Sequence, residues 1–194
     1  MRKRTTTAGR LSPPRPFEEA LCCPPMKKLL LLRHAKSSWE DSSLPDFERP
    51  LNERGLRAAP LVGRFLRERK IRPELVICSP AKRTRETIAL VIEAAGINPE
   101  LRYDERIYEA TVQRLLEVVS EIEAGKREVM LVGHNPGFEN LLERLTGERA
   151  RMPTAALCQI ILDIENWSEA PAKVGRLDWF VKAKGPANSR KSDK

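Results

Sequence analysis

The stretch Lys27–Lys36 reads KKLLLLRHAK, and its middle decides the fold. Four leucines in a row, with charged residues on both sides, predict a short strand buried on both faces of a sheet. Arg33 and His34 follow at once. In open α/β sheets, ligands bind just beyond the carboxyl ends of parallel strands, so these two side chains stand where a ligand would bind. The alternative is a leucine-rich strand that stops at ordinary surface charge.

Two further apolar runs are followed by similar side chains. Residues 74–78 read ELVIC and precede a segment that contains Arg83 and Arg85. Residues 128–133 read EVMLVG and precede His134. The chain has only two histidines, and each directly follows an apolar run. Cations that converge at one edge of a sheet suit an anion, and the fixed fork of arginine suits phosphate in particular.

Helical patterns lie between these runs, which predicts an α/β fold with a mostly parallel sheet flanked by helices on both faces. One helix is expected from Asn52 to about Lys70, with a kink or a restart at Pro60 because proline lacks the backbone donor. Two late apolar runs, at 155–164 and 177–181, contain alternating β-type residues. They predict a C-terminal β-pair on or beside the sheet.

Composition and charge limit the classes of partner. A chain of 194 residues with 41% hydrophobic residues is one globular domain of ordinary size. Of the net charge of +8, residues 1–25 carry +3 and residues 182–194 carry +4, so the body holds 25 basic and 24 acidic residues. A body this balanced does not predict a nucleic-acid-binding face. Because no apolar run approaches the roughly 20 residues of a membrane span, we expect no membrane partner either.

Both ends of the chain are predicted to be disordered, as a basic tail at 182–194 and an extension at 1–25 that has five prolines and no hydrophobic period. The first 17 residues contain basic and hydroxyl residues without acid, which weakly resembles a transit peptide. Met26, directly before the first strand, is a plausible natural start instead. The four cysteines have no common metal-ligand spacing and indicate a reducing compartment, so the expected location is cytoplasmic.

Three blocks of the chain resemble the signature of the histidine phosphatase superfamily. They are RHAK at 33–36, the Ser-Pro-x-x-Arg-x-x-x-Thr pattern at 79–87, and VGHNP at 132–136, in the family's order and each after a strand. The resemblance covers about residues 26–181 and implies a three-layer, phosphoglycerate mutase-like domain. The segment RPLNERG at 49–55 is most similar to the SixA-like phosphohistidine phosphatase branch.

The resemblance also assigns roles by matched position. His34 would be the nucleophile and would form a phosphohistidine intermediate. Arg33 and Arg83 would bind the phosphoryl oxygens, and His134 would complete the pocket as a donor. Two guanidinium groups would also disfavour protonation of His34, which must be neutral to attack. The resemblance implies no metal and no cofactor, and the chain contains no His-x-His or His-Glu-x-x-His spacing.

The sequence leaves more than one candidate for the residue that protonates the leaving group. Many members of the family place a carboxylate in an acidic loop after the second block, and Glu109 matches that position best. Asp104 and Glu105 are its rivals, and the alternative for Glu109 is a solvated or helix-capping carboxylate. For Arg85 and Lys36 we expect a salt bridge or a place on the rim of the pocket.

The sequence leaves the substrate open between two classes on one site. The first is a protein that carries phosphohistidine, and the second is a small phosphorylated metabolite. A non-catalytic phosphate-binding module is a further alternative, although such a module would not need the nucleophile. Nucleic-acid binding is suggested by the basic ends alone, and oligomeric state is not predicted.

Overall fold

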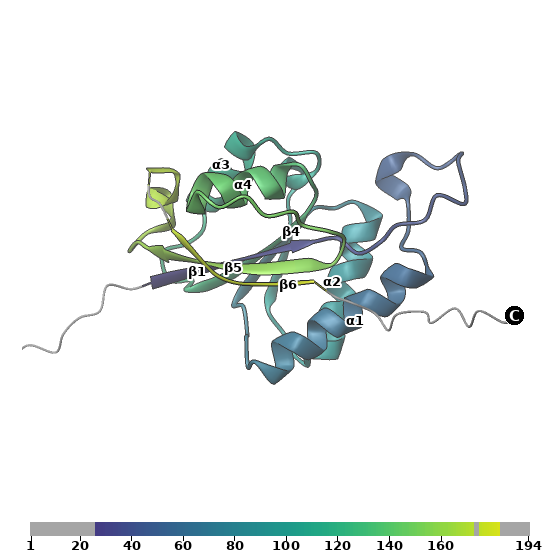
Figure 1. Cartoon of the computed structure of the whole chain (residues 1–194), viewed down its shortest axis with the longest axis horizontal. Coiled ribbons are helices and arrows are strands. Elements are labelled where there is room, and N and C mark those ends of the chain that lie inside the picture. Colours follow the sequence, from purple (N-terminus) through teal and green to yellow (C-terminus); the bar gives the residue numbers. More distant parts are fainter. Residues whose placement is uncertain (1–25, 173–174, 183–194) are drawn as a thin grey trace, which may run out of the picture.

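The computed structural model describes residues 26–172 and 175–182. These residues form one mixed α/β unit in which a sheet lies between two layers of helices (Figure 1). Strands and helices alternate along most of the chain, as the helical patterns between apolar runs predict. The strands are β1 Met26–Arg33, β2 Leu75–Cys78, β3 Glu100–Tyr103, β4 Glu128–Gly133, β5 Ala156–Asp163 and β6 Arg176–Lys182. The helices are α1 Glu53–Glu68, α2 Lys82–Ala95, α3 Val112–Ser120 and α4 Gly137–Thr146, with 3-10 turns η1 Asp46–Glu48, η2 Glu105–Ile107 and η3 Trp167–Ala172.

The sheet order is β3-β2-β4-β1-β5-β6. Strands β3, β2, β4 and β1 are parallel to one another, whereas β5 pairs antiparallel with β1 and β6 antiparallel with β5. The predicted C-terminal β-pair is therefore confirmed as two strands that extend the main sheet. The three strands that precede the candidate cations, β1, β2 and β4, are direct neighbours, so their carboxyl ends meet at one edge.

The four leucines of β1 fill both cores of the domain, because successive side chains of a strand point to opposite faces. Leu29 and Leu31 pack into the cluster that includes α3, α4 and η3, and Leu30 and Leu32 pack into the cluster that includes α1 and α2. All four are fully buried. Each such burial contributes about 1.5–3 kcal/mol, which makes β1 the centre of the fold.

Helix α1 begins where the sequence predicts. The side chain of Asn52 accepts a hydrogen bond from the backbone N–H of Gly55 at 3.0 Å, which caps the helix. Gly55 itself lies against the carbonyl of Lys36, where a Cβ atom would collide with that oxygen. The glycine of the RPLNERG segment therefore lets the helix approach the loop that follows β1.

The prediction of a restart at Pro60 is wrong, because α1 runs through this residue as one helix. Its buried face, which includes Ala59, Val62 and Leu66, packs against α2 and the sheet. The free energy of this packing offsets the one backbone hydrogen bond that Pro60 cannot make.

One predicted end of the domain, the start of the C-terminal tail at residue 182, lies within the described residues. Strand β6 continues through Lys182, so the first residue of the predicted tail belongs to the sheet. The extension at 1–25 and the tail from 183 to 194 lie outside the described residues. Within the described ranges, no helix has the length and apolar character needed to cross a bilayer.

Candidate active site

Three neighbouring strand ends carry the candidate residues to one edge of the sheet. The backbone N–H of His34 donates to the carbonyl of Gly133 at 3.0 Å, which ties the end of β1 to the end of β4. The N–H of Ser79 donates to Val132 at 2.9 Å, which ties the end of β2 to β4. His34 directly follows β1 and His134 directly follows β4, so the two rings face one another with centroids 5.0 Å apart.

His34 is held with one ring nitrogen free. The side chain is 8% exposed, and its Nδ1 lies 2.7 Å from the carbonyl oxygen of Ala35. Because a carbonyl can only accept, Nδ1 carries the proton and donates it, so Nε2 keeps its lone pair. Burial, with a smaller contribution from the charges of Arg83 and Arg33, lowers the pKa of His34 to about 4. The imidazole is thus neutral at physiological pH.

Thr87 on α2 fixes the residue that holds His34. Its Oγ1 accepts a hydrogen bond from the backbone N–H of Ala35 at 3.0 Å and donates to the carbonyl of Arg83 at 2.6 Å. The last position of the second block is therefore connected to the nucleophile candidate through Ala35. This connection also ties the first turn of α2, which carries Arg83, to the loop after β1.

His134 lies between Arg83 and Ser79. Nη2 of Arg83 lies 3.3 Å from Nδ1 of His134, and Ser79 Oγ lies 2.9 Å from Nε2. A guanidinium can only donate, so Nδ1 accepts and Nε2 carries the proton. Burial, together with the nearby His34 and Arg83, lowers the pKa of His134 to about 3. Both histidines are therefore neutral in the substrate-free protein.

The two arginines have different hydrogen-bond partners. Arg83 is 6% exposed, and its guanidinium reaches His134 and Asp46. Arg33 donates from Nη1 to the carbonyl of Met152 at 2.7 Å, while its buried Nε has no partner among the described residues. Arg33 also lines a cavity of about 380 Å³ together with residues 151–153 and the start of α4. The site thus combines two neutral imidazoles with two guanidinium groups.

Comparisons with known proteins identify the family to which the chain belongs. The sequence model of the histidine phosphatase superfamily (branch 1) matches residues 29–112, which include the first two blocks. An uncharacterized chloroplastic protein of Arabidopsis thaliana is 32% identical over 164 residues, which cover 79% of this chain and 74% of the relative. The chain belongs to the histidine phosphatase superfamily.

Solved structures place the domain near SixA. The SixA protein of Nakamurella multipartitia, assigned as a phosphohistidine phosphatase, matches with a TM-score of 0.73 and 25% identity over 82% of this chain and 98% of that protein. The corresponding SixA protein of Agrobacterium tumefaciens matches with a TM-score of 0.70 and 29% identity over 80% of this chain and 97% of that protein. The family and these neighbours support phosphatase activity for this histidine phosphatase.

The three acidic candidates of the sequence make no side-chain hydrogen bond to either histidine among the described residues. Glu109 is exposed, has a positive φ of 48°, and makes no side-chain hydrogen bond to the described residues. Asp104 is engaged with Arg106 at 2.7 Å, and Glu105 is exposed. The role of Glu109 stays a prediction, and no contact among the described residues brings it to His34 or Arg83.

Asp46 is the carboxylate that the sequence analysis missed. Its Oδ2 lies 2.8 Å from Nη2 of Arg83 and accepts from the hydroxyl of Tyr108 at 2.9 Å. The ring of Tyr108 lies 5.4 Å from the ring of His134, edge to face. The only sequence signal for Asp46 was local: it stands three residues before Arg49, with which it forms an ion pair at 3.0 Å.

The remaining candidates have peripheral positions or inert chemistry. Arg85 and Lys36 are both exposed. Burial raises the pKa of the Cys78 thiol to about 12, so this residue is not a thiolate nucleophile at neutral pH. Within the described ranges, no group of three His, Cys, Asp or Glu side chains is arranged to hold a metal ion.

Proposed function

We propose that this protein is a phosphohistidine phosphatase in which His34 is the nucleophile. One observation carries the proposal: a buried, neutral imidazole with a free Nε2 lies among two arginines and a second histidine. A neutral imidazole is the form that can attack phosphorus. Guanidinium groups supply the charge that stabilises the equatorial oxygens during phosphoryl transfer.

In the first step, the lone pair of His34 Nε2 forms a bond to phosphorus and the bond to the leaving group breaks. The positive charge that develops on the ring is stabilised by the hydrogen bond from Nδ1 to the Ala35 carbonyl. In the second step, water attacks the phosphorus and His34 leaves as a neutral imidazole. We propose Arg33 and Arg83 as ligands of the phosphoryl oxygens in both steps.

His134 would need a second proton, on Nδ1, to donate to a phosphoryl oxygen while its Nε2 proton stays directed at Ser79. Its Nε2 proton is directed at Ser79, and its Nδ1 accepts from Arg83. A phosphoryl group with up to two negative charges beside the ring would raise the pKa of His134 from its lowered value, because a nearby opposite charge favours the protonated form. We therefore propose that substrate binding itself converts His134 into a donor.

Two observations bear on the class of substrate. The names of the SixA neighbours support a phosphohistidine-bearing protein, and an imidazole leaving group is less basic than an alkoxide. The cavity of about 380 Å³ beside Arg33 favours the second candidate, a small phosphorylated metabolite, because Arg151 and Lys182 line it and would attract a further anionic group. We rank the phosphohistidine protein first.

The test is a comparison of kcat/KM on a phosphohistidine-containing protein and on a panel of phosphate esters, with the purified full chain. The proposal predicts hydrolysis of phosphohistidine with a higher kcat/KM than that of any ester. A preference for one anionic ester would favour the small-metabolite function. Binding of inorganic phosphate without hydrolysis of any substrate would indicate a non-catalytic phosphate-binding module.

We also propose a cytoplasmic location, which is a separate question from activity. The Arabidopsis relative is named chloroplastic, so a targeting function of residues 1–25 is the specific alternative. A fluorescent protein fused behind residues 1–25 tests it in cells of the source organism. Diffuse cytoplasmic fluorescence is expected, and fluorescence confined to an organelle would contradict the proposal.

A further inference from the structure

A carboxylate borders the candidate phosphoryl site from the loop between β1 and α1. Asp46 accepts from Arg83 twice, through Nη2 to Oδ2 at 2.8 Å and through Nη1 to the backbone carbonyl at 2.5 Å. Both terminal nitrogens of the arginine are therefore directed at one residue. The bonds to Asp46 and His134 use three of the five N–H donors of Arg83. A phosphoryl group that takes the donors now directed at Asp46 would displace this carboxylate from the guanidinium.

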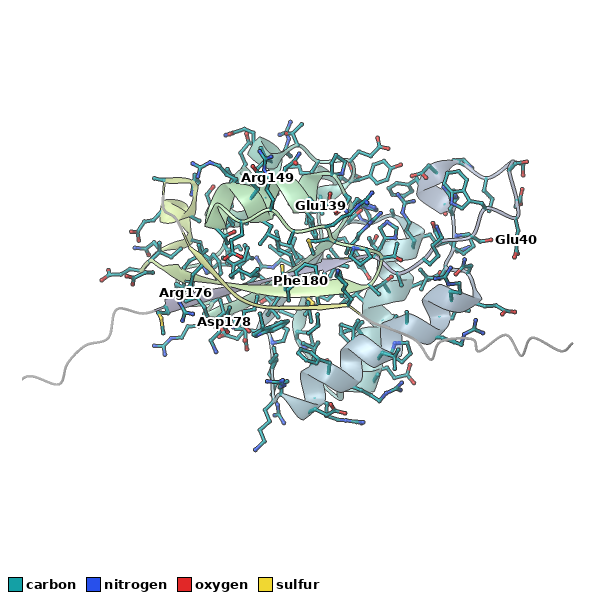
Figure 2. The ribbon with its side chains drawn as sticks, viewed as in Figure 1. Glu40, Glu139, Arg149, Arg176, Asp178 and Phe180 are labelled. Carbon is teal, nitrogen blue, oxygen red and sulfur yellow. The ribbon has the colours of Figure 1, made fainter. Side chains whose placement is uncertain are left out.

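Asp46 is fixed at this place by the structure of its own loop. Arg49 is 5% exposed and donates from Nη1 to Oδ1 of Asp46 at 3.0 Å. The same guanidinium is held by the carbonyl of Ser38, which accepts from Nε at 2.9 Å and from Nη2 at 2.8 Å. Arg49 thus keeps Asp46 beside the site even when Arg83 turns to another partner. The tip of this loop, marked by Glu40, extends away from the body of the domain (Figure 2).

The position of Asp46 suits the leaving group. His34 is 8% exposed and attacks from inside the domain, whereas the side chain of Asp46 is 45% exposed and stands at the mouth of the site. In an in-line displacement, the leaving atom lies on the side of the phosphorus opposite the nucleophile. We place Asp46 on that side because its side chain is exposed whereas His34 is buried, and an exposed carboxyl group can exchange its proton with water.

The charge of Asp46 depends on whether Arg83 is free. Burial opposes ionisation, but hydrogen bonds from Tyr108 and Arg83 outweigh it and lower the pKa of the carboxyl in the substrate-free protein. A bound phosphoryl group would take donors from Arg83 and add negative charge nearby. Both changes raise the pKa of a carboxyl group, with Arg49 left as its remaining close cation. A rise in the pKa of Asp46 on substrate binding would favour the protonated form of its carboxyl group.

We infer that Asp46 is the proton donor of the phosphatase reaction, an inference that rests on the proposed function. As His34 Nε2 bonds to phosphorus, the P–N or P–O bond breaks and its electron pair passes to the leaving group. The leaving group takes the proton from Asp46, which becomes a carboxylate. When water attacks phosphohistidine-34, its proton passes to that carboxylate and restores the acid.

The test compares four proteins on three substrates. Wild type, Asp46→Asn, Glu109→Gln and Glu48→Gln are measured on a phosphohistidine peptide, on p-nitrophenyl phosphate and on an alkyl phosphate. Glu48 is the matched control, because it is an exposed carboxylate on the same 3-10 turn. The readouts are kcat, KM, the pH profile of kcat, and the inhibition constant of inorganic phosphate.

We expect Asp46→Asn to lower kcat on the alkyl phosphate by about 10²–10⁴-fold, the usual contribution of general acid catalysis. The loss on p-nitrophenyl phosphate, whose leaving group needs little protonation, should be far smaller. On every substrate that turns over, including the phosphohistidine peptide, the decline of kcat at high pH should disappear in this variant. Glu48→Gln should match the wild type in all readouts.

Three results would overturn the inference. An equal loss on all substrates with an unchanged pH profile would make Asp46 a residue that only positions Arg83. Faster turnover with tighter phosphate inhibition would make it an internal competitor of the substrate. A leaving-group-dependent loss in Glu109→Gln alone would return the role to Glu109. A wild type that turns over no substrate and forms no phosphoenzyme would instead refute the proposed function, which is a separate outcome.

Discussion

Lowering the pH from about 7.5 to 5 should destabilise the wild-type protein by about 2 kcal/mol more than a His34→Asn variant. Burial holds the pKa of His34 at about 4 in the folded state, below the ordinary value of 6.5 that applies when the chain unfolds. Between these values the unfolded state binds a proton that the folded state does not. The contribution of this histidine to stability is therefore present above 6.5 and is lost as the pH falls. The change to pH 5 covers about 1.5 pH units below 6.5, and each unit contributes about 1.36 kcal/mol, which gives the difference of about 2 kcal/mol.

The assay is urea denaturation of wild type, His34→Asn and Arg64→Gln at the two pH values. Asparagine keeps a donor near the Ala35 carbonyl but does not titrate, and Arg64 is an exposed residue that serves as the control. Groups distant from His34 contribute equally to all three proteins, so the difference between the pH slopes reports on His34 and on the neighbouring His134, whose pKa His34 helps to lower. Equal slopes for wild type and His34→Asn would mean that the imidazole titrates near its ordinary pKa and is not held neutral by the fold.

Three further predictions concern the groups around His34 and the ends of the chain. Arg83→Ala should weaken inhibition by vanadate or inorganic phosphate by about ten- to a hundred-fold, because a buried charged hydrogen bond contributes roughly 1.5–3 kcal/mol. Unchanged inhibition would mean that Arg83 does not bind the phosphoryl group. Thr87→Val removes the acceptor of the buried Ala35 N–H, so it should lower the free energy of unfolding by about 1–3 kcal/mol and also lower kcat. Thr87→Ser should restore both quantities. A valine variant as active and as stable as the wild type would contradict this positioning role. Deleting 1–25 and 183–194 should leave phosphatase activity intact, and loss of activity on this deletion would show that the ends belong to the catalytic unit.

The strands and the site edge were predictable because they depend on short-range patterns. Four consecutive leucines read as a doubly buried strand, and the side chain that follows such a strand must stand at the edge of the sheet. The adjacency of β1, β2 and β4 brings His34 and His134 to ring centroids 5.0 Å apart. The cap at Asn52 was predictable from the sequence in the same way, since it is a local contact between a side chain and the next turn.

The contacts that the sequence did not predict depend on the paths of loops. Asp46 meets Arg83 across 37 positions of sequence, and no periodicity reports where a polar loop returns to the sheet. Thr87 meets Ala35 across 52 positions in the same way. Pro60 illustrates the opposite error, because a local rule allowed a restart of the helix that the packing of α1 against α2 overrides. Local signals are reliable where one segment decides the outcome, and they fail where two distant segments decide it together.

The most direct test of the account is the covalent intermediate on His34. Wild type and His34→Asn are mixed with a phosphohistidine protein that carries radiolabelled phosphate, quenched within milliseconds, and separated under denaturing conditions. The account predicts label on the wild-type chain that is stable in base and labile in acid, maps to the peptide containing His34, and is absent from the variant. Label retained by His34→Asn, or label on any other residue of the wild type, would contradict the assignment of the nucleophile.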